Sequence, residues 1–243
     1  FHLTKEGIPY GTIILGSRAT WLDRHAAEEL RSYVKKLSGA TLIITHECYA
    51  SSIEGGKILI GRASTSDIVA EFAAHYPDVL PEESDTENDC VAYAVRGDTL
   101  VISGSNDRSV YYSVCHLLQT EFGVGFYWDR DVFEKKRSLS LPDGLTLQER
   151  SEFKMRHTIG QWVYNYGAFL NEAERREELD KYARNKINSY RLYSWNSYAR
   201  KKTFIELGLT GIEITAEDIA RLGEGGLCLG CKPCHWPNCP FGK

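Results

Sequence analysis

The sequence predicts an α/β fold, and three observations predict it. Through the first 128 residues, short apolar runs typical of strands alternate with amphipathic stretches typical of helices. A strand–helix–strand pattern recurs between residues 153 and 195, which is typical of a βαβ unit in a parallel sheet. Residues 228–243 differ from both regions, since they hold four of the seven cysteines. We therefore expect α/β structure followed by a Cys-rich tail.

The composition is that of a folded protein of 243 residues, long enough for one large domain or two ordinary ones. Apolar residues make up 42% and aromatic residues 12%, so a sizeable core can be buried. The net charge of -4 argues against a dedicated nucleic-acid-binding protein. No apolar run approaches the length of a membrane span, so we expect no membrane partner.

The compartment stays open, leaning towards the cytoplasm. The chain begins with Phe1 and its only methionine is Met155, so we expect an N-terminus that has been processed, trimmed or lost. A signal peptide could have been removed from this end, but nothing in the sequence shows one. Cys48, Cys90 and Cys115 are scattered and show no pairing pattern, which favours a reducing compartment.

The first module opens with a buried strand at 12–16 and the clearest helix at 21–39, ended by Gly39 as its C-cap. Charged residues, Asp23 and Glu29 among them, lie mostly off the apolar stripe of this helix. The stripe consists of Leu22, Ala26, Leu30, Tyr33, Val34 and Leu37. Two strands at 41–47 and 57–63 and a shorter helix at 65–76 follow, with Ser64 or Thr65 as the N-cap.

A β-hairpin is predicted at 90–104, because Gly97-Asp98 is a turn dipeptide between two alternating runs. Residues 105–128 begin with a capping cluster and continue as a helix, with Cys115 in the core and His116 beside the apolar face, partly exposed.

Residues 129–152 are charged, with short strand-like pieces, and we interpret them as the link between two modules. A strand at 153–162, a helix at 171–187 and a strand at 188–195 form the predicted βαβ unit. The inward residues of its helix are Leu179, Tyr182, Ala183 and Ile187.

Four stretches occur in an order that resembles one group of enzymes: "RHAAEELRSYVKKLSGA", "ILIGR", "YAVRGDTLVISGSNDRSVYYSVCHLLQTEFGVGFYWDRD" and "SLPDGLTLQERSEFKMR". Residues 10–195 are similar to the N-terminal region of bacterial α-glucuronidase and α-N-acetylglucosaminidase-like glycoside hydrolases. The resemblance implies a non-catalytic α/β sandwich at 1–150, a mixed sheet with helices on one face. It further implies the first βαβ unit of a (β/α)8 barrel at 151–196. We expect that barrel to be incomplete, since a closed one takes roughly 250 residues.

The resemblance implies no catalytic residue in this chain. Glycoside hydrolysis generally needs two carboxylates, and in these families the pair lies further along the barrel than its second strand. The acidic residues of the 171–187 helix fit a solvated helix face better: Glu172, Glu174, Glu177, Glu178 and Asp180.

Three residues are candidates for sugar contact by analogy with barrel enzymes. Arg156 and His157 end the stretch "FKMRH" (153–157), which the resemblance implies is the first strand of the barrel, and barrel active sites collect their residues at such strand ends. Trp162 follows in the next loop. An indole stacks on a sugar face, and a guanidinium holds a carboxylate with two hydrogen bonds. The alternative for Trp162 is a place in a core or interface.

The tail has the spacing Cys228-x2-Cys231-x2-Cys234-x4-Cys239. Four thiolates at such gaps surround one zinc ion or hold an iron–sulfur cluster, so the tail predicts zinc or Fe-S as cofactor. Disulfides in an oxidising compartment, or free thiols, are the alternatives. No cofactor is expected for the glycosidase-like part.

The stretch "ITAEDIARLGEGGLCLGCKPCHWPNCPFGK" resembles the Cys-rich C-terminal tail of bacterial molybdopterin-binding proteins, which makes residues 197–243 a separate segment. The two parts of the chain thus resemble different families. This would follow from a natural fusion, from a truncated gene with a new tail, or from an assembly artefact in the sequence.

The leading hypothesis is therefore an accessory domain and barrel fragment of a carbohydrate-active glycoside hydrolase, inactive alone. We expect its partner to be a carbohydrate, either a polysaccharide or a glycoside of a uronic acid or an amino sugar. The alternatives are a metal- or Fe-S-binding protein related to molybdopterin-binding proteins, and a scaffold protein. Sequence leaves the oligomeric state undetermined.

Overall fold

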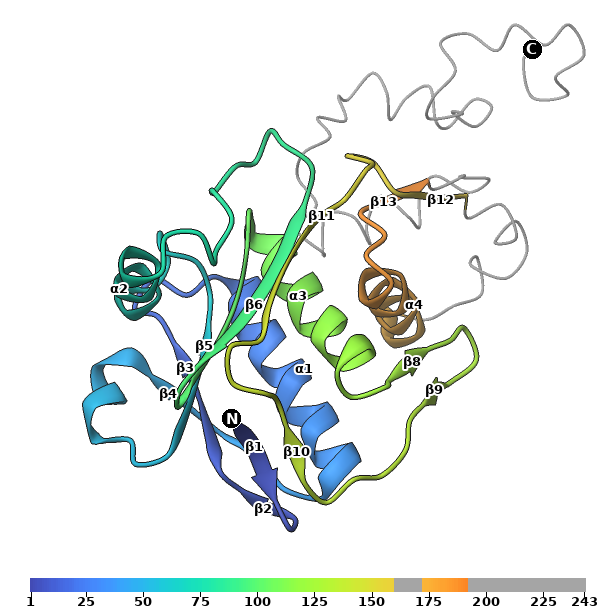
Figure 1. Ribbon diagram of the computed structural model, residues 1–243. Helices are drawn as coiled ribbons and strands as arrows, with labels where there is room; N and C mark the ends of the chain where they lie inside the picture. Colours follow the sequence, from blue (N-terminus) through green and yellow to red (C-terminus); the bar gives the residue numbers. More distant parts are fainter. Residues whose placement is uncertain (160–171, 192–243) are drawn as a thin grey trace, which may run out of the picture. The chain divides into compact units, whose positions relative to one another are not determined.

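The structure, a computed structural model, describes residues 1–159 and 172–191 (Figure 1). The chain divides into two compact units. The first consists of Phe1–Arg156 and Glu178–Asn188. The described part of the second consists of residues 157–159, 172–177 and 189–191. The predicted site residue Trp162 and the four tail cysteines, Cys228, Cys231, Cys234 and Cys239, lie outside the described residues.

A mixed six-stranded sheet forms the centre of the first unit, in the order β11-β6-β7-β5-β3-β4. Strands β4, β3, β5 and β7 run parallel, whereas β6 pairs antiparallel with both β7 and β11. The strands are β3 (Gly11–Leu15), β4 (Ile43–His46), β5 (Gly56–Ile60), β6 (Cys90–Arg96), β7 (Thr99–Gly104) and β11 (Thr146–Arg150). The predicted mixed sheet and its hairpin are confirmed.

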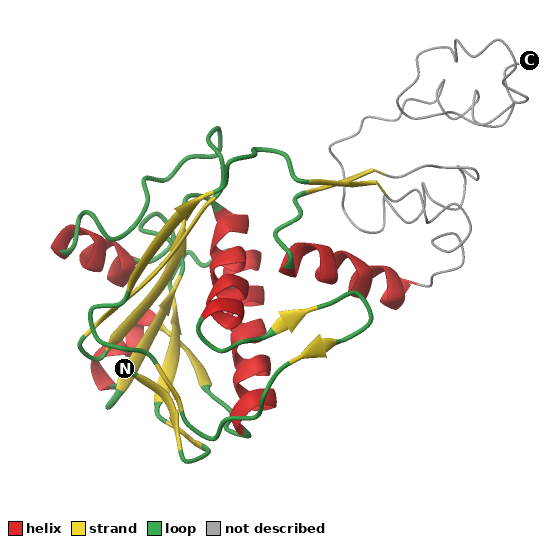
Figure 2. Cartoon of the chain, turned by 45° about the vertical axis from the view of Figure 1, so that its right-hand side comes forward, coloured by secondary structure: helices red, strands yellow, loops and turns green. Residues whose placement is uncertain are grey.

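Helices α1 (Trp21–Ser38) and α3 (Asp107–Thr120) lie together on one face of this sheet, as predicted (Figures 1 and 2). The shorter α2 (Asp67–His75) covers part of the opposite face. The strands therefore bury side chains in both directions. Ile58 and Ile60 of β5 join the large core under α1 and α3, while Leu59 between them joins a smaller core under α2.

The helix ends follow from local capping. Thr20 and Asp23 form a capping box at the start of α1, and Gly39 takes a left-handed φ of 81° at its end, as predicted. The N-cap of α2 is Ser66, whose side chain accepts from the Val69 N–H. The prediction of Ser64 or Thr65 as the N-cap is therefore wrong. Helix α3 ends at Thr120 rather than near residue 128, and β8 (Gly125–Phe126) follows it.

Residues 129–152 are not a link between modules, and that prediction is wrong. Within them, β9 (Asp131–Val132) pairs with β8, and β11 forms an edge of the central sheet by pairing with β6. Strand β10 (Leu139–Ser140) pairs with β1 (His2–Lys5), which in turn pairs with β2 (Ile8–Pro9). The segment looked like a link because its strands are short and largely exposed, so they lack an apolar pattern.

The predicted parallel βαβ unit is present in the described residues. It consists of β12 (His157–Ile159), α4 (Glu172–Arg184) and β13 (Ser189–Arg191), and β12 and β13 pair in parallel with His157 opposite Ser189. Tyr182 and Ala183 are half-buried, as expected for the inward face. Leu179 is 42% exposed, so its predicted inward position is wrong, whereas Ala183 packs against the large core.

Among the described residues, no helix is long and apolar enough to cross a membrane.

Candidate functional site

The carboxyl ends of the parallel strands meet at one edge of the sheet. Strand β3 lies between β4 and β5. The chain runs from β3 to β4 on one side of it and then crosses to β5 on the other side, so the direction of winding reverses at β3. In open α/β sheets, ligands bind in the crevice outside such a reversal. A binding site is therefore expected at this edge.

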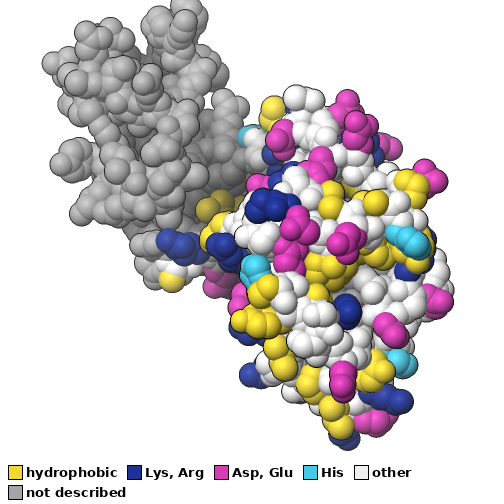
Figure 3. All heavy atoms as spheres, turned by 90° about the vertical axis from the view of Figure 1, so that its left-hand side faces the viewer, with side chains coloured by type: hydrophobic (Ala, Val, Ile, Leu, Met, Phe, Trp, Pro, Cys, Tyr) yellow, Lys and Arg dark blue, Asp and Glu magenta, His cyan; other side chains and the backbone are white. Residues whose placement is uncertain are grey.

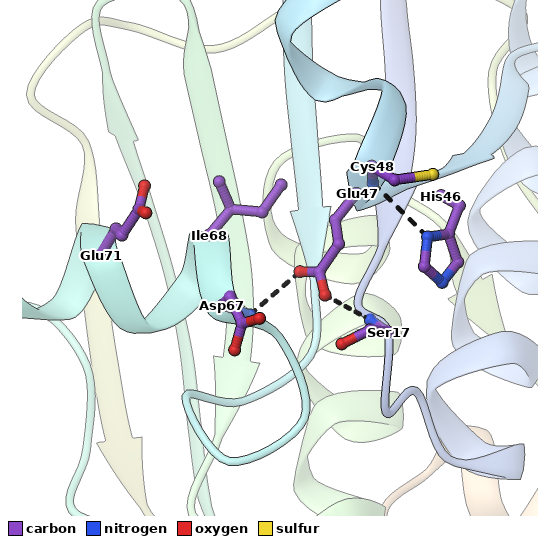
Figure 4. Close-up of a pocket in the computed structure, with 7 residues that line it drawn as sticks. All are labelled: Ser17, His46, Glu47, Cys48, Asp67, Ile68 and Glu71. Carbon is purple, nitrogen blue, oxygen red and sulfur yellow. Dashed lines mark hydrogen bonds between the residues drawn. The ribbon is translucent and has the colours of Figure 1, made fainter.

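A shallow pocket of about 370 Å³ lies at this edge (Figure 4). Its lining comes from the residue after β3, the end of β4, the start of the 3-10 helix η1 (Glu47–Ser52) and the first turns of α2. The lining residues are Ser17, His46, Glu47, Cys48, Asp67, Ile68 and Glu71.

Glu47 is the central group of this pocket. Its carboxylate accepts hydrogen bonds from the Ser17 N–H (2.5 Å), the Ser66 hydroxyl (2.8 Å) and the Asp67 N–H (3.0 Å). Burial raises the pKa of Glu47, but the hydrogen bonds from Ser17 and Ser66 outweigh burial and lower it to about 2. The ionised side chain thus occupies the N-terminus of α2, where the helix favours a negative charge. Glu47 is a structural anion and not a proton donor at neutral pH.

The other polar groups of the pocket make contacts of their own. Arg18 donates to Asp67 at 2.7 Å, and the His46 Nδ1 accepts from the Cys48 backbone N–H at 3.4 Å. Figure 3 shows acidic, basic and apolar side chains mixed on the face of the molecule on the α2 side. In the part of the chain that the structure describes, no group of three or more His, Cys, Asp or Glu residues could hold a metal ion.

A second polar centre surrounds Asp89, which directly precedes β6 and is 3% exposed. Its Oδ1 accepts from the Asn106 amide (2.9 Å) and the Arg108 Nε (2.8 Å), and its Oδ2 accepts from Arg156 (2.5 Å) and the Asn188 amide (3.2 Å). We call these five residues the Asp89 cluster. Burial raises the pKa of Asp89, but the hydrogen bonds from Asn106 and Arg156 and the charge of Arg108 lower it below its ordinary value.

Arg156, a predicted sugar contact, belongs to this cluster. Besides Asp89, its guanidinium donates to the Lys186 carbonyl (2.5 Å), the Ser151 hydroxyl (2.9 Å) and the Phe153 carbonyl (2.9 Å). All three of its nitrogens therefore have protein partners. A sugar contact for Arg156 stays a prediction, and a substrate would have to compete with these bonds.

His157 and the acidic residues of α4 are described in part. His157 begins β12 and Arg156 directly precedes it, so the prediction that these two residues end the strand is wrong. His157 is exposed, and its Nδ1 lies 3.0 Å from the Ser189 hydroxyl. Its predicted sugar contact stays a prediction. Glu178 accepts from the Tyr182 hydroxyl, and Asp180 lies 3.9 Å from the His25 Nε2. Both carboxylates thus make contacts within the first unit, and the absence of a catalytic pair on α4 stays a prediction.

His116 is buried, with 7% of its surface exposed, so the prediction of a partly exposed residue is wrong. Its Nδ1 accepts from the Lys186 ammonium at 2.6 Å, and its Nε2 lies 3.7 Å from the Glu149 carboxylate. The segments that carry these partners, distant in sequence, cover the imidazole. Burial first, and then the Lys186 charge, lowers the pKa of His116. Cys115 beside it is fully buried, as predicted, and burial raises the pKa of its thiol.

Sequence reasoning missed Glu47 and Asp89 as polar centres. Glu47 is the last residue of one predicted strand, and Asp89 directly precedes another. That position is the signal that could have singled them out, because polar residues at strand ends are the ones a sheet edge brings together.

Comparisons with known proteins find likeness in structure alone. No family model matches the sequence, and no curated protein matches it. The chain is similar to a GH115 4-O-methyl-α-glucuronidase with specificity for decorated arabinogalactans, with a TM-score of 0.54 and 16% identity over 78% of this chain and 25% of that one.

Two further solved structures have TM-scores below 0.5, too low to support an argument. A family 89 glycoside hydrolase from Clostridium perfringens gives 0.45 with 13% identity, covering 84% of this chain and 19% of that chain. CpGH84D gives 0.47 with 14% identity, covering 90% and 39%. The chain thus spans well under half the length of each of the three. The GH115 likeness shows that the α/β fold described above also occurs in part of a glycoside hydrolase.

Proposed function

We propose that this chain supplies the accessory α/β module and the first βαβ unit of a carbohydrate-active glycoside hydrolase, and that it is inactive alone. The observation that carries the proposal is the fold. A mixed sheet with two helices on one face precedes a parallel β12-α4-β13 unit, and a GH115 enzyme has a similar fold over 78% of this chain. The substrate class is a uronic-acid or amino-sugar glycoside.

Three carboxylates of the described residues, Glu47, Asp89 and Asp23, do not fit the role of the proton donor. Glycoside hydrolysis needs one carboxylic acid that holds a proton at working pH, paired with a second carboxylate. Glu47 and Asp89 have lowered pKa values, so neither holds a proton there. Burial raises the pKa of Asp23, but this side chain is fully buried in the capping box of α1 and cannot reach a substrate.

The test is an assay of the purified chain with aryl α-glucuronides and aryl N-acetyl-α-glucosaminides. We expect no turnover above a heat-denatured sample. Turnover that persists through repurification would overturn the inactive part of the proposal.

The binding part is tested by titration calorimetry with oligosaccharides that carry glucuronic acid. We expect weak binding that Trp162→Ala abolishes, whereas the control Trp128→Ala, at an exposed tryptophan outside the barrel segment, leaves it unchanged. Equal loss in both variants, or no binding by the wild-type chain, would count against sugar contact at Trp162.

We also propose, independently, that Cys228, Cys231, Cys234 and Cys239 bind one zinc ion or an Fe-S cluster, as part of a segment related to molybdopterin-binding proteins. The cysteine spacing favours it, because gaps of two residues let neighbouring thiolates turn to one centre. Elemental analysis and a visible spectrum of protein prepared without oxygen test it. We expect stoichiometric metal, lost in Cys231→Ser/Cys234→Ser and kept in the control Cys48→Ser. Metal retained in the double variant would rule out this ligand set.

A further inference from the structure

The two oxygens of the Asp89 carboxylate hold different parts of the first unit. Oδ1 binds Asn106 and Arg108, which are the N-cap and a first-turn residue of α3. Oδ2 binds Arg156 and Asn188, which are 32 residues apart in sequence. One buried carboxylate therefore joins the start of α3 to two chain segments that are distant from it and from each other.

Arg156 and Asn188 also bind each other through the backbone. The Arg156 N–H donates to the Asn188 side-chain oxygen at 2.8 Å, and the Asn188 N–H donates to the Arg156 carbonyl at 3.2 Å. The next residues along the chain, His157 and Ser189, are the first paired residues of β12 and β13. Arg156 and Asn188, which bind Oδ2, therefore directly precede β12 and β13.

The charges at the cluster limit which side chains can replace Asp89. One carboxylate faces two guanidinium groups, and Asp89 and Arg156 are both largely buried. A carboxylate accepts at both oxygens, whereas an amide of the same shape accepts at one end and donates at the other. Buried ion pairs of this kind contribute little net stability but are costly to break on one side, and in some proteins they select one arrangement over others.

We propose that Asp89 is a positioning residue that sets the parallel register of β12 and β13 by holding Arg156 and Asn188 side by side. A slip of either strand by one residue would move one of these donors away from Oδ2 and leave a buried guanidinium or amide without its acceptor. This role does not depend on the proposed glycosidase function, since it rests on hydrogen bonds within the first unit.

The test is hydrogen exchange of the full chain carrying Asp89→Asn, followed by mass spectrometry or NMR. We expect exchange at residues 157–159 and 189–191 to become at least about tenfold faster, while the amides of β5 and β7 keep their protection. In labelled protein, cross-strand NOEs between residues 158 and 190 should weaken, a change that a purely stabilising role would not produce. The matched control is Asp67→Asn, which breaks an exposed ion pair with Arg18. It should leave hydrogen exchange unchanged both at residues 157–159 and 189–191 and in β5 and β7.

A second pair of variants serves if Asp89→Asn fails to fold. Asn188→Ala removes a donor to Oδ2 together with the acceptor of the Arg156 N–H, whereas Arg108→Ala removes a donor to Oδ1. We expect faster exchange at 157–159 and 189–191 in Asn188→Ala and wild-type exchange there in Arg108→Ala. Equal effects of the two variants, a uniform change across both regions, or unchanged exchange and NOEs in Asn188→Ala would each overturn the proposal.

Discussion

Glu47 shows how one side chain completes an edge of the sheet. It lies just after β4 and accepts from the residue after β3 and from the first turn of α2, so it joins the ends of three elements. The same position makes it the negative charge that the N-terminus of α2 favours. The pocket around it is therefore formed by a group whose hydrogen-bonding capacity is already used within the protein.

We predict that Glu47→Gln lowers the free energy of unfolding by about 1–2 kcal/mol at pH 7, because the amide replaces a charged acceptor of three hydrogen bonds at a partly solvent-screened site. Urea unfolding checks this. The pKa of Glu47 is lowered in the folded chain, so its stabilisation is present above about pH 4.5 and is lost as the pH falls towards 2. The two proteins should therefore approach each other in stability in acid.

The control for this experiment is Glu71→Gln, at an exposed position of α2 in the same pocket. It should change the free energy of unfolding by less than about 0.5 kcal/mol. A Glu47→Gln effect no larger than the control at pH 7 would contradict the structural role of the carboxylate.

At the scale of single elements, Gly39 tests why α1 ends where it does. Its φ is 81°, and a Cβ at this position would meet nothing within 4 Å. Gly39→Ala should therefore cost about 1 kcal/mol through backbone strain alone. Gly39→Asn should cost less, because Asn tolerates the left-handed region. Thermal or urea unfolding measures both, and equal losses would mean that strain at this residue does not explain the helix end.

Sequence patterns predicted the elements with strong periodicity and missed those that depend on distant partners. The apolar runs of β3, β5 and β7 are buried on both faces and are readable without a structure. Strand β11 is not, because three of its five residues are exposed in succession and its strand identity comes from pairing with β6, about fifty residues earlier. Candidate sites follow the same rule. The burial of His116 depends on Lys186, and the role of Arg156 depends on Asp89, 67 residues away.

At the scale of the whole molecule, several titrating groups make the folded state less stable as the pH falls. Glu47 and Asp89 have lowered pKa values, so each contributes stability that is lost in acid. His116 also has a lowered pKa, so the folded state binds its proton less well than the unfolded state, and stability falls as the pH drops below about 6.5. Asp23, whose pKa is raised by burial, opposes them with stability that is greatest in acid.

We predict that the urea midpoint of the chain rises from pH 3 to about pH 7, with His116 responsible for the upper part of the rise. The charged groups that face His116 are Lys186, Glu149 and Glu121, and protonation of the imidazole would place a second cation against the Lys186 ammonium. His116→Gln should flatten the profile between pH 5 and 7 and leave its acid limb in place. A variant profile that keeps the wild-type slope between pH 5 and 7 would exclude His116 as its cause.

The pairing of β1 with β10 has a consequence for the order in which the first unit can form. His2 lies opposite Ser140, and the Phe1 amino group donates to the Leu141 carbonyl at 2.9 Å. During synthesis, β3, α1, β4 and β5 emerge early and can pair within about sixty residues, whereas the small sheet has to wait until β10 leaves the ribosome. Strand β1 precedes its partner β10 by more than 130 residues, so nascent chains that end before residue 139 leave one edge of β1 exposed to other molecules.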